Sequence, residues 1–222
     1  MSRRFDVVTF DCYGTLVDWE GGIASAFVRE AESDGVRLVR SQVVHAYHDV
    51  EPEVEAARYR PYRDVLSETA QRVARRLGWP LAPGKAGFLA ASLPDWRPFP
   101  DTNAALRDLA DAGCRLGILS NVDDDLLART RERLIAPFDV VVTAEQVRSY
   151  KPAPGHFLEA RRRIGDGRWL HAAQSWFHDV VPASALGIPV AWINRKGEPR
   201  PDGAKPAVEL RDLAALAVWL RG

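Results

Sequence analysis

The sequence has little cysteine, no net charge and no long apolar run, and each of these absences excludes a class of protein. Two cysteines in 222 residues are too few for a disulfide framework. Lysine plus arginine and aspartate plus glutamate number 30 each, so no overall field attracts nucleic acid or an anionic surface. No apolar stretch reaches the roughly 18 residues that a membrane-spanning helix needs. We therefore expect neither nucleic acid nor a membrane among the partners.

The first residues lead directly into a short apolar segment, without the apolar core or cleavage site of a signal peptide. We expect a cytoplasmic protein that acts on a small-molecule substrate as a monomer or homodimer. Cys12 and Cys114 lie beside predicted core strands, which favours reduced, buried thiols. Because neighbouring side chains on a strand point to opposite faces, Cys12 should point away from any pocket that Asp11 faces.

Short β-rich runs recur along the chain, and the segments between them carry helical signals. Asp101-Thr102 reads as a helix cap, and Gly113 closes the same helix. The spacing of apolar residues from Leu210 to Leu220 predicts a last helix that packs on the sheet. Alternating strands and helices predict an α/β, Rossmann-like, doubly wound parallel sheet. The predicted strands are Phe5–Phe10, Arg115–Ser120, Asp139–Thr143, Trp169–Ala173 and Val190–Ile193.

One long interval departs from this alternation of strands and helices, because residues 21–97 are rich in helical pattern and poor in strands. We predict an inserted helical cap there, with residues 1–20 and 98–222 forming the core. His45 and His48 fall on one face of a predicted cap helix at nearly helical spacing. A metal site is conceivable for this pair, but solvent exposure is the favoured interpretation.

Polar residues follow each of the first four predicted strands. They are Asp11–Leu16, Ser120-Asn121, Tyr150-Lys151-Pro152 and Gln174–Asp179. The carboxyl ends of parallel strands meet at one edge of the sheet, where such folds place their sites. A single aspartate there would be read as a helix cap. A carboxylate, hydroxyls, a lysine and a second carboxylate together favour a nucleophile, its hydrogen-bond donors, a cation and a base.

These four segments resemble the four motifs of the haloacid dehalogenase superfamily. The segment Phe-Asp-Cys-Tyr-Gly-Thr-Leu-Val-Asp is similar to the first motif and Leu-Ser-Asn to the second. Tyr-Lys-Pro is similar to the third motif, and the segment around Asp179 to the fourth. All four occur in the expected order, with the cap between the first two. The resemblance implies a hydrolase that forms a covalent ester on an aspartate.

The resemblance and the chemistry assign the same catalytic roles. Asp11 is the expected nucleophile, and the charge of Lys151 is expected to lower the pKa of Asp11. The hydroxyls of Thr15 and Ser120 are expected to donate to Asp11. Asp179 is expected to hold Lys151 and activate water, with helix capping as its structural alternative. His178 is equally a base or a surface histidine. The expected substrate contacts are Tyr13, Asn121, Gln174, Ser175, Trp176 and His178.

Two positions indicate which bond is hydrolysed. Tyr13 stands where phosphatases of the superfamily have a second aspartate, and Gln174 stands where one of their paired magnesium-binding aspartates aligns. A leaving halide needs neither a proton nor a metal, so we predict a relative of the 2-haloacid dehalogenases that requires no cofactor. The run Trp192–Arg195 is also similar to that branch.

Two other functions stay open. In a magnesium-dependent small-molecule phosphatase, Asp11, the carbonyl of Tyr13 and Asp179 would hold the ion, because such oxygens suit a hard cation. A non-catalytic ligand-binding relative is the other alternative, since function does not follow from fold.

The cap departs from the dehalogenase branch, which uses an early arginine to hold the substrate carboxylate. Ala46 or Tyr47 aligns near that position, and Arg40, Arg58 and Arg60 are candidate substitutes. Tyrosine does not replace the fork of an arginine matched to a carboxylate. This departure puts a small 2-haloacid in doubt as the natural substrate.

Overall fold

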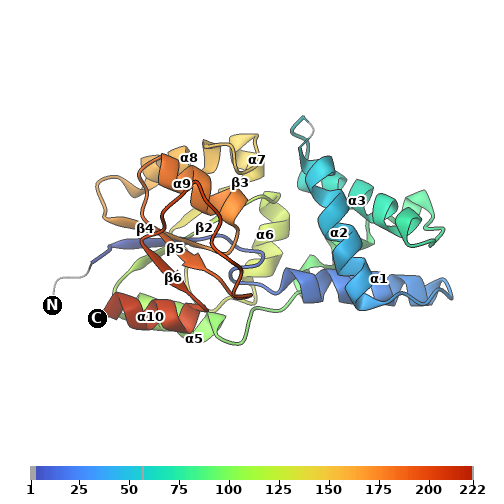
Figure 1. The fold of residues 1–222 in the computed structure, drawn as a ribbon, viewed down its shortest axis with the longest axis horizontal. Helices are drawn as coiled ribbons and strands as arrows, with labels where there is room; N and C mark the ends of the chain where they lie inside the picture. Colours follow the sequence, from blue (N-terminus) through green and yellow to red (C-terminus); the bar gives the residue numbers. More distant parts are fainter. Residues whose placement is uncertain (1–3, 57, 222) are drawn as a thin grey trace.

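The computed structural model describes residues 4–56 and 58–221, and its centre is a parallel β-sheet (Figure 1). The strand order is β3-β2-β1-β4-β5-β6, and every neighbouring pair is parallel. This order confirms the predicted α/β class with its doubly wound sheet. The strands are β1 Val7–Phe10, β2 Arg115–Ser120, β3 Val140–Thr143, β4 Trp169–Ala173, β5 Val190–Ile193 and β6 Val208–Leu210.

The predicted strands agree closely with the observed ones. The bounds of β2, β4 and β5 are as predicted, and β1 and β3 begin slightly later. The prediction for Leu210 was wrong, because this residue closes the edge strand β6 and the last helix begins only at Leu213. A three-residue strand is too short to show a period of two, so its apolar residues read as an extension of the following helix.

Helices cover both faces of the sheet. In Figure 1, α8 and α9 lie on one side of the strands and α5 and α10 on the other. Val7 and Val8 of β1 belong to different apolar clusters, as expected where successive side chains point to opposite faces. Among the described residues, none of the helices has the length and apolar character to cross a membrane. The core helices are α5 Thr102–Asp111, α6 Asp124–Arg131, α7 Ala144–Val147, α8 Gly155–Ile164, α9 Val181–Ala185 and α10 Leu213–Arg221.

A second group of helices connects β1 to β2 and stands beside the sheet (Figure 1). The carboxylate of Asp18 accepts a hydrogen bond from the backbone N–H of Gly21, at 3.0 Å, and so caps the first of them. The helix α2 packs against both α1 and α3. The residue boundaries of this cap, 21 and 97, stay a prediction. The cap helices are α1 Trp19–Ser33, α2 Arg40–Glu55, α3 Tyr62–Arg76 and α4 Phe88–Ser92, with 3₁₀ turns at Pro83–Lys85 and Leu93–Asp95.

Asp101 does not cap α5 through its side chain, contrary to the sequence prediction. Its carboxylate instead accepts a hydrogen bond from the backbone N–H of Leu213 at 2.8 Å, at the start of α10. Both of its oxygens also accept from the guanidinium of Arg195, each at 3.0 Å. The carboxylate therefore joins three segments that are distant in the sequence.

The two cysteines differ in burial. Cys12 is fully buried, as predicted, and burial raises the pKa of its thiol well above the ordinary value. Cys114 is only half-buried, so the prediction of a buried thiol was wrong for it. It precedes β2 at the end where the chain enters the sheet, away from the centre of the core.

The packing of α10 generates a stability prediction. Leu216 is fully buried, whereas Val218 on the same helix is 63% exposed. We expect Leu216→Ala to lower the free energy of unfolding by about 2–5 kcal/mol, because it removes buried methyl groups and leaves a cavity. The control Val218→Ala should change it by less than about 0.5 kcal/mol. Urea unfolding followed by tryptophan fluorescence measures both, and equal losses would contradict the packing described for α10.

Candidate active site

The loop after β1 places Asp11 at the carboxyl edge of the sheet. The backbone N–H of Asp11 still donates to the carbonyl of Ala172 in β4, at 3.1 Å, so this residue continues the strand. The chain turns at Gly14, where φ is +102°. A Cβ at this position would lie 3.1 Å from Nε1 of Trp19, so both the turn and the space require glycine.

The ammonium of Lys151 lies between two buried carboxylates. Its Nζ donates to Oδ1 of Asp11 at 2.9 Å and to Oδ1 of Asp179 at 2.6 Å. A third hydrogen bond goes to the carbonyl oxygen of Leu119 at 2.9 Å. Lys151 is only 1% exposed, which a charged side chain tolerates when it is paired and fully hydrogen-bonded. The structure thus brings together the three residues predicted from three different motifs.

Burial and neighbouring charges shift the pKa values of Asp11 and Asp179 in opposite directions. Burial raises the pKa of Asp11 above its ordinary value, and the attraction of Lys151 opposes this only in part. Lys151 lowers the pKa of Asp11 as expected, but desolvation exceeds this effect and the net shift is upward. Burial also acts on Asp179, but there Lys151 and His171 outweigh it and the pKa falls well below the usual range. Asp179 is the more firmly ionised of the two carboxylates.

Thr15 contacts the nucleophile as predicted, and Ser120 does not. The hydroxyl of Thr15 donates to Oδ2 of Asp11 at 2.9 Å and accepts from the backbone N–H of Gln174 at 2.9 Å. Ser120 is 1% exposed, yet its Oγ has no hydrogen-bond partner within the described ranges. The predicted bond from Ser120 to Asp11 is therefore absent there, and this hydroxyl is free to meet a ligand.

Asn121 fixes the backbone of the lysine. Its Oδ1 accepts from the N–H of Lys151 at 2.7 Å, and its Nδ2 donates to the carbonyl of Lys151 at 3.0 Å. The same Nδ2 donates to Oε1 of Glu55 in the cap at 3.1 Å. Asn121 therefore links Lys151 to the cap.

A buried histidine beneath the site was missed by sequence reasoning. Nε2 of His171 lies 2.9 Å from Oδ1 of Asp179, and its Nδ1 lies 2.8 Å from Oγ1 of Thr9. Nε1 of Trp169 donates to the same threonine at 2.7 Å. His171 lies within β4 rather than after it, so an examination of strand ends does not find it.

The segment after β4 lines the opposite wall of the site. Nδ1 of His178 lies 3.1 Å from Oγ of Ser175, and its Nε2 lies 3.5 Å from a carboxylate oxygen of Glu55. Burial alone would lower the pKa of His178, but Glu55 outweighs it and the pKa is raised. His178 lines the cavity while 31% of its side chain is exposed, so it is both a wall residue of the site and a surface histidine. Nε1 of Trp176 is buried without a hydrogen-bond partner in the described part of the chain.

These residues line one cavity of about 360 Å³ between the core and the cap. All the predicted site residues except Thr15, which lies just beneath, take part in its wall. The prediction missed Glu51 and Glu55 of α2, which also line it. The sequence pattern that could have revealed them is the interval of four residues between Tyr47, Glu51 and Glu55. This interval places both acids on the same buried face of a helix as the tyrosine. The other lining residues that the prediction missed are Trp19, Ile23, His48, Pro52, Tyr62, Trp96, Phe177 and Glu198.

Within the described ranges, no arginine lines this cavity. Arg40 donates to the carbonyl of Gly21 on the outside of the cap, and Arg60 pairs with Glu68 at 2.6 Å. Arg58 is exposed. None of the three candidate substitutes therefore holds a ligand beside Asp11.

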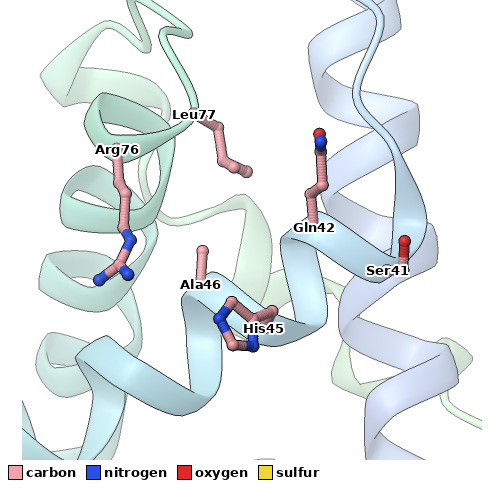
Figure 2. A pocket seen from close by; sticks show the side chains of 6 residues that line it. All are labelled: Ser41, Gln42, His45, Ala46, Arg76 and Leu77. Carbon is pink, nitrogen blue, oxygen red and sulfur yellow. The ribbon is translucent and has the colours of Figure 1, made fainter.

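Of the two aligned positions, Tyr47 lines this cavity and Ala46 lies elsewhere. Figure 2 shows it in a separate hollow between α2 and the end of α3, of about 610 Å³. His45 lines the same hollow, and its side chain is 79% exposed, as predicted. His48 is bonded to Glu20 at 2.6 Å. The hollow contains none of the predicted catalytic or substrate-binding residues.

A magnesium ion at this site would have to share its carboxylates with Lys151. Both Asp11 and Asp179 already accept from the ammonium through Oδ1, and Oδ2 of Asp179 has no partner in the described part of the chain. Gln174 adds only a neutral amide. Among the described residues, no three acidic, histidine or cysteine side chains gather in a metal-binding cluster.

The chain is similar in sequence and fold to known hydrolases. An (S)-2-haloacid dehalogenase of Pseudomonas putida is 27% identical over 225 residues, which cover 98% of this chain and 97% of that protein. A glyceraldehyde 3-phosphate phosphatase of Methanothermobacter thermautotrophicus is 34% identical over 105 residues, 44% of this chain and 45% of that one. The L-2-haloacid dehalogenase of Xanthobacter autotrophicus has the same fold, with a TM-score of 0.85 at 22% identity and coverage of 98% and 99%. The model of the haloacid dehalogenase-like hydrolases matches residues 5–173, and this chain belongs to that family.

Proposed function

We propose that this hydrolase cleaves carbon–halogen bonds through an ester on Asp11, without a metal ion. The observation that carries the proposal is the pair of donors on the nucleophile. Lys151 holds Oδ1 of Asp11 and Thr15 holds Oδ2, so the carboxylate is oriented and charge-balanced by the protein itself. Residues 21–97 form the cap that covers this site, and 1–20 with 98–222 form the core.

In the first step, a carboxylate oxygen of Asp11 attacks the carbon that bears the halogen. The carbon–halogen bond breaks, and the halide leaves with the electron pair. The hydroxyl of Ser120 and the indole N–H of Trp176 support this step, because both are donors without partners that line the cavity. Donors already aimed at a developing negative charge lower the barrier at no reorganisation cost.

In the second step, water attacks the carbonyl carbon of the Asp11 ester. The alcohol leaves, the carboxylate is restored and one proton is released. Asp179 is suited to orient and activate this water, because its Oδ2 has no hydrogen-bond partner among the described atoms and it lines the cavity. The lowered pKa of Asp179 keeps this carboxylate ionised and able to orient the water. Burial would lower the pKa of Lys151, but Asp11 and Asp179 outweigh it, so Lys151 remains charged throughout.

A phosphatase is the second candidate, and the half-length similarity to a phosphatase favours it. Tyr13 argues against it. The hydroxyl of Tyr13 is bonded to Oγ1 of Thr130 at 2.8 Å, and burial raises its pKa well above the ordinary value. A side chain held in this way is a poor proton donor to a leaving alcohol.

Heavy-oxygen labelling tests the covalent route. We expect that during a single turnover in H₂¹⁸O the label enters Asp11 before it appears in the alcohol, because water attacks the ester carbonyl. Mass spectrometry of the peptide that contains Asp11 measures it, with the Asp11→Asn variant as the control. The assay covers short bromo compounds that carry a carboxylate, an amide or an ammonium group, with and without a chelator. Label in the first alcohol but not in Asp11 would contradict the ester, and loss of halide release on chelation would contradict metal independence.

Replacement of the buried lysine tests the charge balance. We expect Lys151→Met to lower the rate of halide release by about a hundredfold or more, because the electrostatic partner of the ester oxygen is lost. Lys205 is exposed and provides the control Lys205→Met, which should retain the parent rate. Circular dichroism verifies that both variants are folded. A folded Lys151→Met chain with nearly the parent rate would refute the role of this lysine.

A further inference from the structure

The charge on the cavity wall is opposite to what a carboxylate substrate needs. Five carboxyl side chains line the cavity, and Lys151 is the one lysine or arginine among its described lining residues. That lysine is already committed to Asp11 and Asp179. A substrate carboxylate would therefore enter a cavity with an excess of negative charge and no fork of donors to receive it. The acids beyond the catalytic pair are Glu51, Glu55 and Glu198.

Two of these acids differ in how far their charge is already neutralised. Glu55 accepts from Asn121 at 3.1 Å and lies 3.5 Å from Nε2 of His178. Glu51 receives only one neutral donor, the hydroxyl of Tyr62, at 3.3 Å. Within the described residues neither Glu51 nor Glu198 forms an ion pair, and His178 acts on Glu51 only through its charge at longer range.

Aromatic rings surround the same space. The rings of Trp19 and Tyr47 lie with centroids 5.6 Å apart, and those of Tyr13 and Trp96 lie 5.7 Å apart. The faces of such rings attract cations, most strongly where water is excluded. Acids and aromatic rings together are the surroundings in which proteins hold alkylammonium groups. The aromatic lining residues are Tyr13, Trp19, Tyr47, Tyr62, Trp96, Trp176 and Phe177.

Groups without partners at the other end of the cavity point to a ligand there. Ser120 is 1% exposed and Asp179 is fully buried, yet Oγ of one and Oδ2 of the other have no hydrogen-bond partner among the described atoms. Buried polar atoms are rarely left unpaired unless something else meets them. We propose that the substrate is an alkylammonium compound whose cation lies against Glu51 and the aromatic wall while its halogen-bearing carbon lies at Asp11.

This assignment rests on the proposed function for the reacting end and adds the substrate class. The bonds that form and break are those of the two steps described under the proposed function. The carbon–halogen bond is exchanged for the Asp11 ester, and hydrolysis gives halide, a proton and a hydroxyalkylammonium product. The ammonium group takes no part in bond making and serves only for binding.

Binding of three small probes to the unmodified chain tests the site without turnover. Choline carries the cation, 3,3-dimethylbutan-1-ol has the same shape without charge, and lactate carries a carboxylate. We expect choline to bind at least about tenfold more tightly than either of the others at pH 9, on the usual scale of a desolvated cation against aromatic rings. Calorimetry measures the affinities. Lactate or the neutral alcohol binding as tightly as choline would overturn the proposal.

A matched pair of variants on α2 locates the cation. Glu51→Gln should remove most of the preference for choline over the neutral alcohol, because it deletes the free carboxylate and keeps the shape. Glu53→Gln should leave it unchanged, since the Glu53 side chain is 73% exposed and lies outside the cavity. An undiminished preference in Glu51→Gln would place the cation elsewhere and contradict the proposal.

The pH dependence of binding gives an independent signature. Burial, followed by repulsion from Glu55, raises the pKa of Glu51 to about 8. The other groups that act on Glu51 are Tyr62 of α3 and His178, and both favour its ionised form. Below pH 8 the bound cation must therefore expel a proton, so the affinity for choline should rise as pH increases from 6.5 to 9. The neutral alcohol should not follow this trend, and a choline affinity that stays flat would contradict the role of Glu51.

Halide release separates failure of the site from failure of the reaction. We expect (2-bromoethyl)trimethylammonium to release bromide faster than 2-bromopropionate. Tight choline binding with no bromide release from any compound would refute the proposed reaction and support the cation site. Bromide release from 2-bromopropionate alone, with weak choline binding, would support the reaction and refute the cation site.

Discussion

The ammonium of Lys151 is the point on which the catalytic edge of the sheet depends. It reaches Asp11 after β1, the carbonyl of Leu119 in β2 and Asp179 after β4, so one buried cation joins three strands. Breaking a buried pair by removing one partner costs about 3–5 kcal/mol, because the remaining charge is left unpaired. The pairing therefore constrains the positions of both carboxylates, whatever it contributes to net stability.

The remaining contacts orient this group from two sides. From below, His171 contacts Asp179 and connects it to Thr9 within the sheet. From the side, Arg195 donates to the carbonyl of Thr15 at 2.9 Å and to Asp101, which steadies the loop of the nucleophile. Asp11, the proposed nucleophile, is thus held by several elements, which is the condition for a carboxylate to attack along a fixed line.

The cap determines what meets the nucleophile. Glu55 reaches across to Asn121, whose amide also holds the backbone of Lys151, so the acidic wall and the catalytic lysine share one hydrogen-bonded residue. A cavity that combines this wall with aromatic rings differs chemically from one built around an arginine. In the proposed function Asp11 carries the reaction, and in the proposed cation site the lining residues of α2 set the selectivity.

The sequence by itself determined the parallel sheet, five of its strands and the convergence of Asp11, Lys151 and Asp179, because local periodicity and the strand-end rule require no knowledge of packing. It could not determine that burial would outweigh Lys151 in setting the pKa of Asp11, or that Ser120 would lack a partner, since both depend on which atoms exclude water. The place of Glu51 in the cavity wall was equally hidden. Only the packing of α2 over the sheet edge brings this acid into the cavity, and the distance between a cap helix and a strand end is a property of the tertiary structure alone.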